Sequence, residues 1–262
     1  MRRWCFLSLT VLLVVGAVVP AAAQETTTVT VIHAVPADDG FPADVYLNED
    51  LIIDGFVFEA ASDLFTIPAG RAHLRIFADG SDPDTADPAV TDDVTFTAGR
   101  DYTIVAQILG SAPVLTVFIN DTSQIPAGQG RLTVRQTSGI ADLDITLDGE
   151  PLFAALAQAN EATAEVAAGS HTLAFLSGGD QVADRTFTLA EGQLTVIYAV
   201  GVPEEDSFSV LLQQVVAQQT EPGGVPTGTG GMKAGGNWLP WLALLATSGL
   251  IVLWKRDDQA RR

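Results

Sequence analysis

Residues 72–77 read Ala-His-Leu-Arg-Ile-Phe, and the pattern of this stretch decides the fold class. Leu74 and Ile76 alternate with His73 and Arg75, which places apolar and polar side chains on opposite sides of an extended segment. A period of two is typical of a β-strand with one buried face and one face in solvent. We therefore predict an all-β fold.

Similar runs surround this stretch at regular spacing. Asp, Gly, Pro and Asn separate them, and these residues favour turns. Seven or eight short strands in about 90 residues are the pattern of an immunoglobulin-like β-sandwich. The predicted strands of the first half cover 28–33, 44–47, 51–58, 64–67, 72–77, 94–97, 102–109 and 114–119.

The pattern then starts again in the second half of the chain. Residues 144–152 (DITLDGEPL) restate residues 44–52 (DVYLNEDLI), and residues 166–173 restate residues 67–74. Matches in an unchanged order indicate an internal repeat, and copies of this size can each bury their own core. We predict two tandem β-sandwich domains, at 24–120 and 131–217.

Three segments depart from the strand pattern. Residues 152–164 are rich in Ala, Leu, Gln and Glu, which predicts a short helix or helical turn. Residues 121–130 contain Pro and Gly and are predicted to form a linker that can act as a hinge. Residues 218–237 form a spacer rich in Gly and Pro, which spans roughly 25 Å on average if it is flexible.

The N-terminus has the features of a secretory signal peptide. Arg2 and Arg3 precede an apolar run over 4–19, and small residues follow it at 21–23. We predict cleavage after Ala23, with an uncleaved anchor as the alternative. The single cysteine, Cys5, lies inside this segment, so the mature chain has no thiol for a disulfide, a zinc site or a nucleophile.

The C-terminus has the features of a membrane anchor. Residues 238–254 carry no charge and reach the lower limit of a spanning helix, about 17 residues. Trp residues lie near both ends of the run, and the basic tail at 255–262 follows, which predicts a cytoplasmic C-terminus and external domains. A buried core helix is one alternative for this run. Cell-wall attachment is another, because Val225-Pro-Thr-Gly-Thr229 resembles a sortase signal in layout but not in register.

The external part of the chain is strongly acidic. Residues 24–237 contain 30 Asp and Glu against 7 Lys and Arg, a net charge of −23. Phosphate backbones and anionic lipid head groups would be repelled, which excludes nucleic acid as a partner. Cations and basic partners remain compatible with this charge.

Two neighbouring motifs carry a resemblance to a known family. Residues 30–38 read Thr-Val-Ile-His-Ala-Val-Pro-Ala-Asp, and residues 43–48 read Ala-Asp-Val-Tyr-Leu-Asn. They resemble the signature of the domain of unknown function 4397 family, and Ile67-Pro-Ala-Gly70 also fits it. The resemblance covers 28–213 as two copies, the second with Gln136 in place of His33. It implies exported, surface-attached bacterial or archaeal proteins with a β-sandwich fold and no known reaction.

Acidic loops are the candidate metal sites. Calcium needs six to eight oxygens, which clustered carboxylates and loop carbonyls can supply. A solvated acidic turn is the alternative, because the regular spacing of a calcium loop is missing. The first candidate set is Asp79, Asp82, Asp84 and Asp87, with Asp92 and Asp93 beyond it. The second is Asp38, Asp39 and Asp44.

The histidines give no catalytic constellation. His33, His73 and His171 occupy positions that are not shared between the two copies, and nothing marks a nucleophile elbow. We predict structural roles for the family-motif residues His33 and Asp44, and no organic cofactor. The predicted function is membrane-anchored display of two sandwiches for adhesion or binding of an extracellular protein or glycan. An extracellular hydrolase that uses loop carboxylates, or a passive envelope spacer, is the alternative.

Overall fold

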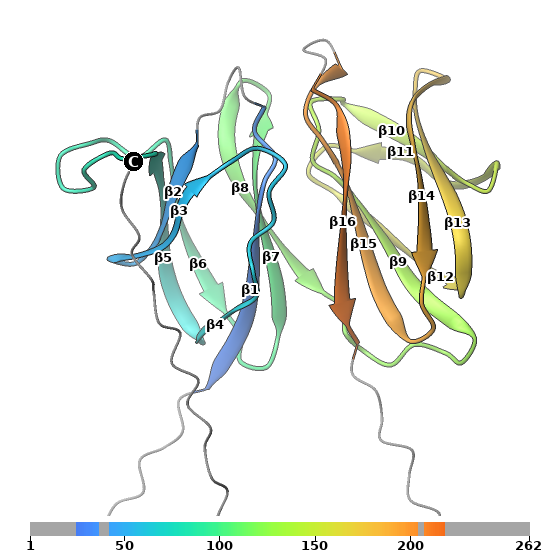
Figure 1. Cartoon of the computed structure of the whole chain (residues 1–262), viewed down its shortest axis with the longest axis horizontal. Coiled ribbons are helices and arrows are strands. Elements are labelled where there is room, and N and C mark those ends of the chain that lie inside the picture. The colour runs from blue at the N-terminus through green and yellow to red at the C-terminus, as the bar shows by residue number, and fades with distance from the viewer. Residues whose placement is uncertain (1–24, 37–41, 204–206, 218–262) are drawn as a thin grey trace, which may run out of the picture. The chain divides into compact units, whose positions relative to one another are not determined.

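The computed structural model describes residues 25–36, 42–203 and 207–217 (Figure 1). These residues form strands and turns without an α-helix, so the predicted all-β fold is confirmed. Within the described ranges, no helix is long and apolar enough to cross a membrane. The expected signal peptide, spacer, transmembrane helix and basic tail lie outside the described residues, as do Ala23, Asp38 and Asp39.

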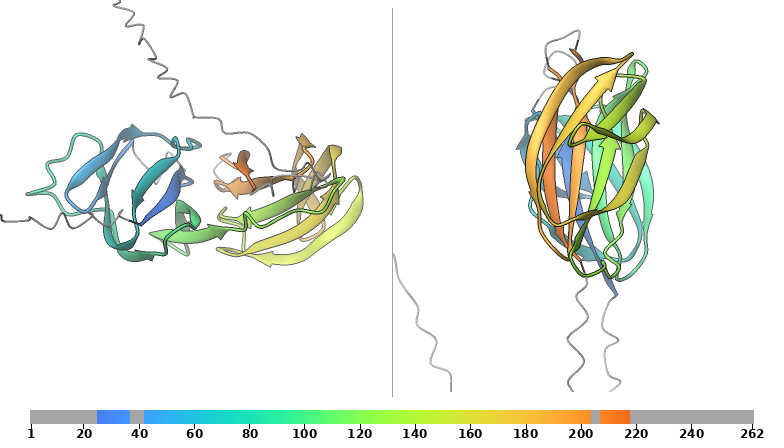
Figure 2. Two further views of the ribbon diagram at one scale, coloured as in Figure 1. Left: turned by 90° about the horizontal axis from the view of Figure 1, so that it is seen from below. Right: turned by 90° about the vertical axis from the view of Figure 1, so that its right-hand side faces the viewer.

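The first sandwich consists of two four-stranded sheets, in the orders β4-β1-β7-β8 and β3-β2-β5-β6. All neighbours are antiparallel except β1 and β7, which run parallel. Figure 2 (left) shows the strands of this sandwich wrapping around a common core. The strands are β1 (Thr26–His33), β2 (Ala43–Leu47), β3 (Asp50–Phe56), β4 (Phe65–Pro68), β5 (Gly70–Ala78), β6 (Val90–Phe96), β7 (Asp101–Leu109) and β8 (Ala112–Asn120).

The second sandwich has the same topology. Its sheets have the orders β12-β9-β15-β16 and β11-β10-β13-β14, and β9 and β15 form its parallel pair. Each strand is the counterpart of the one eight places earlier. The strands are β9 (Gln129–Gln136), β10 (Asp142–Leu147), β11 (Glu150–Ala157), β12 (Glu161–Ala167), β13 (Gly169–Ser177), β14 (Asp180–Leu189), β15 (Gln193–Val200) and β16 (Ser209–Val216).

Local irregularities recur at matching positions in the two sandwiches. The β2–β3 ladder shifts register between Ala43 and Val45, and the β10–β11 ladder shifts between Leu143 and Ile145. Both hairpins turn through a left-handed residue, Asn48 with φ 56° and Asp148 with φ 52°. Such bulges and turns fix which residues face the core, so the two sandwiches follow one folding pattern.

The predicted helix at 152–164 is wrong, because this region forms β11, a turn and β12. Its Ala, Leu, Gln and Glu residues favour a helix in isolation, but pairing with neighbouring strands overrides that preference. Strand β12 pairs with β9 over seven positions, from Glu161 opposite Arg135 to Ala167 opposite Gln129. Its residues alternate between exposed and half-buried, as expected of an edge strand on a core.

Each sandwich encloses its own apolar core, and a third cluster joins the two. The first core draws on β1 to β7 and the second on β9 to β15, with partly buried residues of β16 packed against it. The third cluster lies between sheets β4-β1-β7-β8 and β12-β9-β15-β16. Strands β1, β7, β9 and β15 are therefore buried on both faces. The residues of this joint are Ile32, Ala34, Val105, Phe118, Leu194, Val196, Tyr198, Val200 and Val215.

The linker between the sandwiches is held in place by Arg131. Its guanidinium donates to the carbonyl oxygens of Asp121 (2.7 Å) and Ser123 (3.2 Å), and it forms ion pairs with Asp121 and Glu165. Arg131 is itself buried. These contacts tie the segment that the sequence predicts as a hinge to the second sandwich.

The chain enters and leaves the described unit at one end. The first residues of β1 and the last of β16 line the same shallow cavity of about 270 Å³, with Thr26–Thr28 on one side and Val216 on the other. We call this end the base. The opposite end of the first sandwich, the far end, holds His33 at the end of β1 and Ala43 at the start of β2.

Candidate functional site

The family-motif residues lie together at the far end of the first sandwich. Ala43 pairs with Phe56 at the end of β3 and with Ala78 at the end of β5, so three strands of one sheet meet there. His33 arrives on β1 from the other sheet. This end therefore gathers the sequence candidates His33, Asp44 and Asp79 from segments that are distant in the chain.

His33 is buried and takes part in a turn. Its Nδ1 accepts a hydrogen bond from the Val35 backbone N–H (3.3 Å), and its ring lies 5.8 Å from the Phe56 ring. Gln136 occupies the same place on β9, and its Oε1 accepts from the Ser138 backbone N–H (3.2 Å). An imidazole and an amide thus cap the same kind of turn, which is a structural role that needs no proton transfer.

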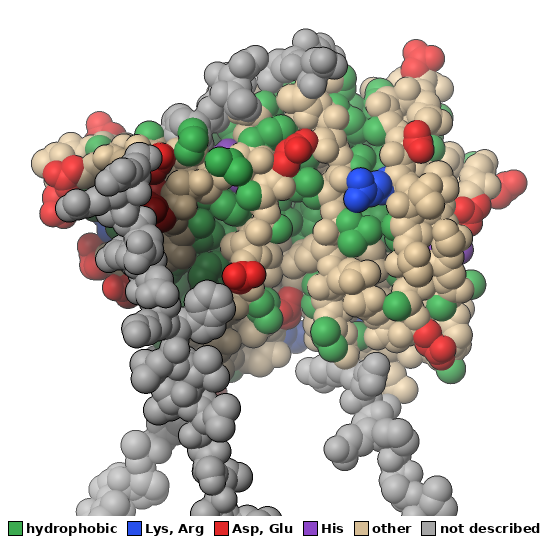
Figure 3. Space-filling model, viewed as in Figure 1, with side chains coloured by type: hydrophobic (Ala, Val, Ile, Leu, Met, Phe, Trp, Pro, Cys, Tyr) green, Lys and Arg blue, Asp and Glu red, His purple; other side chains and the backbone are tan. Residues whose placement is uncertain are grey.

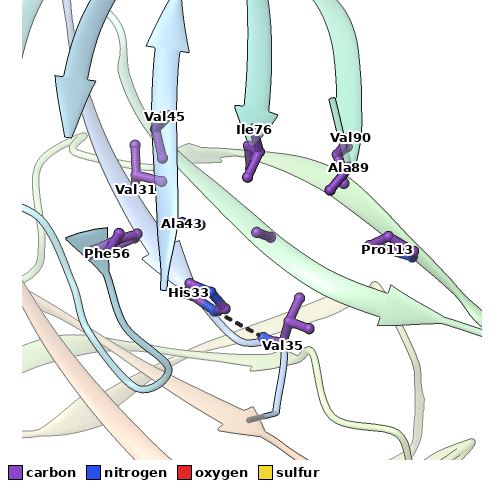
Figure 4. Close-up of a pocket in the computed structure, with 11 residues that line it drawn as sticks. Val31, His33, Val35, Ala43, Val45, Phe56, Ile76, Ala89, Val90 and Pro113 are labelled. Carbon is purple, nitrogen blue, oxygen red and sulfur yellow. Dashed lines mark hydrogen bonds between the residues drawn. The ribbon is translucent and has the colours of Figure 1, made fainter. Parts of the chain in front are cut away.

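A small apolar cavity lies next to His33. Figure 4 shows side chains from β1, β2, β3 and β5 converging on it. The cavity measures about 50 Å³, enough for a few water molecules at roughly 10–15 Å³ each. Ligand pockets are typically about 300–1,000 Å³, so this space is too small for a metabolite. Its lining residues include Val31, Val35, Val45, Ile76 and Pro113.

Asp44 is a buried carboxylate whose two oxygens both accept hydrogen bonds. Oδ1 accepts from the Gly55 backbone N–H and Oδ2 from the Gly80 N–H, each at 3.0 Å. Both glycines have positive φ (61° and 71°), a conformation that favours glycine. Asp144 of the second sandwich repeats one of these bonds, to the Ala155 N–H at 2.8 Å. Asp44 therefore fixes two turns of the far end.

Three carboxylates come together around Asp44. Ligand atoms of Asp44, Asp54 and Asp79 all lie within 4.8 Å of one another, and Asp54 and Asp79 are exposed. Such a group has the oxygen donors that hard cations prefer. The sequence predicted Asp79 as a ligand but paired it with other residues, and it gave Asp54 no role. Asp54 and Asp79 come together because Asp54 lies near the end of β3 and Asp79 directly follows β5, and both strands pair with β2.

The rest of the predicted acidic loop forms an internally bonded turn. Asp82 Oδ1 accepts from the Asp84 backbone N–H (3.1 Å), and Asp82 Oδ2 accepts from the Thr85 hydroxyl (3.0 Å). Asp82, Asp84 and Asp87 are exposed. The three-carboxylate group found among the described residues includes none of them. Calcium binding by the Asp79, Asp82, Asp84 and Asp87 set stays a prediction.

The other two histidines form hydrogen bonds with aspartates at the surface. His73 Nδ1 lies 3.0 Å from Asp93, which also accepts from Arg71 (2.7 Å) and whose pKa is lowered by these two hydrogen bonds. His171 Nδ1 lies 2.7 Å from Asp148. The hydrogen bond between these two raises the pKa of His171 and lowers that of Asp148. The first pair bridges the neighbouring strands β5 and β6, and the second joins β13 to the turn between β10 and β11.

The most extensive buried polar network lies at the joint between the sandwiches, a region for which the sequence predicts no functional residue. The Arg135 guanidinium donates to Asn120 Oδ1, the Tyr198 hydroxyl and Glu161 Oε2, each at 2.8 Å. It also lies over the Phe118 ring, 4.4 Å from its centroid. Arg135 is only 1% exposed. A buried guanidinium with this many partners organises packing, and it links β8 of one sandwich to β9 and β15 of the other.

Comparison with known proteins gives a family for part of the chain. A family model described as a domain of unknown function (DUF4397) matches residues 27–146. Residues 27–146 are thus similar to the DUF4397 family. The match covers the first sandwich together with β9 and most of β10. The predicted family is thereby confirmed for these residues, and it brings no defined reaction.

Two further comparisons complete the picture. No curated protein matches the sequence. A solved structure from Bacteroides fragilis, described as a "putative cell adhesion protein", is 13% identical and covers 70% of this chain and 86% of its own, with a TM-score of 0.21. A likeness at that TM-score supports no inference about fold or function.

Proposed function

We propose that this chain is a membrane-anchored protein that displays two β-sandwiches outside the cell for adhesion or ligand binding. Residues 1–23 would direct export and be removed, and residues 238–254 would hold the chain in the lipid bilayer. The spacer at 218–237 would separate the sandwiches from the membrane. Attachment to the cell wall by the C-terminal segment is the alternative arrangement.

One observation carries this proposal. The chain leaves the described unit at its base, where Val216 lies beside Thr26–Thr28, while β1 runs away from the base to His33. A tether that continues from Val216 therefore leaves the opposite end of the unit free. That arrangement suits a display protein, because the far-end turns held by Asp44 and His33 face away from the attachment point.

The use of Asp44 supports a binding role over a hydrolytic one. A hydrolase of the predicted alternative class needs a carboxylate that can donate or accept a proton at substrate. The Asp44 carboxylate instead accepts two backbone N–H groups and is 3% exposed. Its geometry supports the turns of a displayed surface.

We also propose that both sandwiches are immunoglobulin-like and that the second is a divergent copy of the DUF4397 domain. The shared strand order, the parallel pair in each sandwich and the matching register shifts support a common origin. Gln136 at the place of His33 marks the divergence.

Truncation combined with fractionation tests the anchoring part of the proposal. Cells producing the full chain should retain it in the membrane fraction, whereas a chain that stops after residue 237 should appear in the culture medium. Retention of the truncated chain in the cytosol would contradict export. Probing a glycan array and a protein array with the full chain in detergent then tests for a ligand, and a passive spacer would bind neither.

A further inference from the structure

A groove runs beside β16 on the face shown in Figure 3. One wall is the last part of β16, and the other is the segment 61–64, which runs along β1. The space measures about 390 Å³, within the range of about 300–1,000 Å³ that ligand sites occupy. We call it the β16 groove, and its lining residues are Thr30, Ala61, Ser62, Asp63, Leu64, Asp101, Leu212, Gln213, Gln214, Val215 and Val216.

Strand β16 is an edge strand without the usual protection. It pairs with β15 along one side only, from Ser209 to Val216. Edge strands normally carry charges or proline that discourage pairing with another chain. The four described sheets have eight edge strands, and seven of them contain at least one charged residue or proline. Strand β16, with the sequence SVLLQQVV, contains neither.

The groove also gathers exposed apolar side chains. Val216 is 82% exposed and Leu64 is 60% exposed, the two highest values among the large hydrophobic residues of the described chain. Both line the groove, one on each wall. Exposed apolar side chains that face one another across a groove are typical of a binding surface.

The charge of the groove indicates what kind of partner it favours. Asp63 and Asp101 line it, and its lining residues include no Lys or Arg. Arg100 lies outside the groove, in the adjoining cavity at the base. A second copy of this chain would bring another acidic surface, since the net charge is −19, and would be repelled. A basic partner is attracted.

We propose that the β16 groove binds an extended basic segment of a partner protein, which adds as a fifth strand beside β16. Backbone hydrogen bonds to the open edge would supply affinity, and alternate side chains would contact Leu64, Val216 and Asp63. This inference deepens the proposed binding role and rests on it. The groove inference is tested on the purified protein, so a negative result there leaves the test of membrane anchoring unaffected.

A pair of peptides tests this inference. The probe is a fluorescein-labelled Lys-Val-Lys-Val-Lys-Val-Lys-Val peptide, and its matched control replaces each Lys by Glu. Fluorescence anisotropy with the full chain in non-ionic detergent should show binding of the basic peptide. The Kd of the acidic peptide should be higher by about tenfold or more. An analogue with N-methyl groups along one backbone edge should also bind about tenfold more weakly, because that edge can no longer pair.

Matched variants locate the site. Leu64→Lys and Asp63→Lys should each raise the Kd for the basic peptide about tenfold, because each places a like charge in the groove. The controls are Leu51→Lys and Asp87→Lys, exposed positions outside the groove that should leave the Kd within about twofold. Circular dichroism would confirm that all four variants fold.

Several outcomes would overturn the inference. Equal binding of the basic and acidic peptides, or an equal loss in the control variants, would mean that the groove does not select the peptide. Unchanged binding of the N-methyl analogue would mean that no strand is added. A dimer of the full chain that Leu64→Lys dissociates would make a second copy the occupant. Binding that emerges only after removal of residues 255–262 would assign the groove to the chain's own tail.

Discussion

At the residue scale, Asp44 is the side chain on which the far end depends most. We predict that Asp44→Ala lowers the free energy of unfolding by about 2–4 kcal/mol, because two partly buried hydrogen bonds from backbone N–H groups to a buried carboxylate are lost at about 1–2 kcal/mol each. Asp144→Ala is the matched control. It removes one bond from an exposed carboxylate and should cost about 1 kcal/mol. Urea unfolding of both variants measures the difference, and equal losses would contradict the role assigned to Asp44.

The His171–Asp148 pair predicts a pH dependence. The pKa of His171 is raised above 6.5, so its stabilising contribution is complete below that pH and is lost as pH rises through the folded-state pKa. The pKa of Asp148 is lowered below 3.8, so its contribution is present above that pH and is lost as pH falls through its folded-state pKa. The pair should therefore stabilise the fold most between about pH 4 and pH 6.5.

An NMR titration measures the folded-state pKa of His171 directly. The imidazole should titrate above 6.5, and the difference in melting temperature between the wild type and His171→Asn should shrink from pH 6 toward pH 9. Titration at or below 6.5 would show that Asp148 does not hold the proton on the ring.

Calcium binding at the acidic residues is a third residue-scale prediction. A weak extracellular site has a Kd of about 0.1–1 mM, so about 10 mM calcium should add about 1–3 kcal/mol relative to EGTA. Asp79 belongs both to the predicted loop set and to the group around Asp44, so Asp79→Asn should abolish the effect. Asp180→Asn, at the start of β14 in the second sandwich, should keep it. Calorimetry measures the melting temperature, and a melting temperature that calcium leaves unchanged would exclude the site.

Some features of the candidate site can be predicted from single residues of the sequence, and others cannot. The sequence predicts a structural role for His33, because Gln136 replaces it in the second copy and an amide cannot act as a general base; this role stays a prediction. The hydrogen-bond partners of Asp44 could not be predicted from the sequence. Gly55 and Gly80 are brought to it by register shifts and pairings that depend on the folded sheet. The same holds for Asp54, which lies on β3, a different strand from the β2 of Asp44.

At the element scale, strands β1, β7 and β15 decide how the two sandwiches associate. They are buried on both faces, and Tyr102–Gln107 on β7 is buried without interruption. Strands buried on both sides lose the apolar–polar alternation and become continuously apolar. The sequence therefore contained a signal for the joint in residues 102–106 and 194–200. This signal does not identify the joint, because a central strand buried on both faces has the same apolar pattern in any sheet.

Arg135 at the joint could not be predicted, because arginine is seldom fully buried. We predict that Arg135→Ala lowers the free energy of unfolding by about 3–5 kcal/mol, since the variant lacks the buried guanidinium that donates hydrogen bonds to both sandwiches. Amide exchange should also accelerate at Phe118 and Tyr198, which flank the guanidinium.

The matched control for the joint is Arg185→Ala, an exposed arginine on β14 that should change stability by about 0.5 kcal/mol or less. Arg135→Lys should give an intermediate loss, because an ammonium keeps the charge but lacks the planar fork. A loss in Arg135→Ala no larger than in Arg185→Ala would show that the two sandwiches are not held together through this residue.

At the scale of the whole molecule, the described unit places its base and its far end at opposite ends of the strands. The all-β class could be predicted from the alternation at residues 72–77, and the repeat from matches such as 44–52 with 144–152. The association of the sandwiches could not, because it depends on faces that become complementary only after both sheets have formed. The linker tied down by Arg131 reinforces this association.

Cysteine labelling of intact cells shows on which side of the membrane the sandwiches and the tail lie. Asp87→Cys places a thiol on an exposed loop of the first sandwich, and Gln259→Cys places one in the basic tail. The wild type reports the background, because Cys5 should leave with the signal peptide. We predict that a membrane-impermeant maleimide labels Asp87→Cys on intact cells and Gln259→Cys only after lysis. Labelling of Asp87→Cys only after lysis would contradict the account.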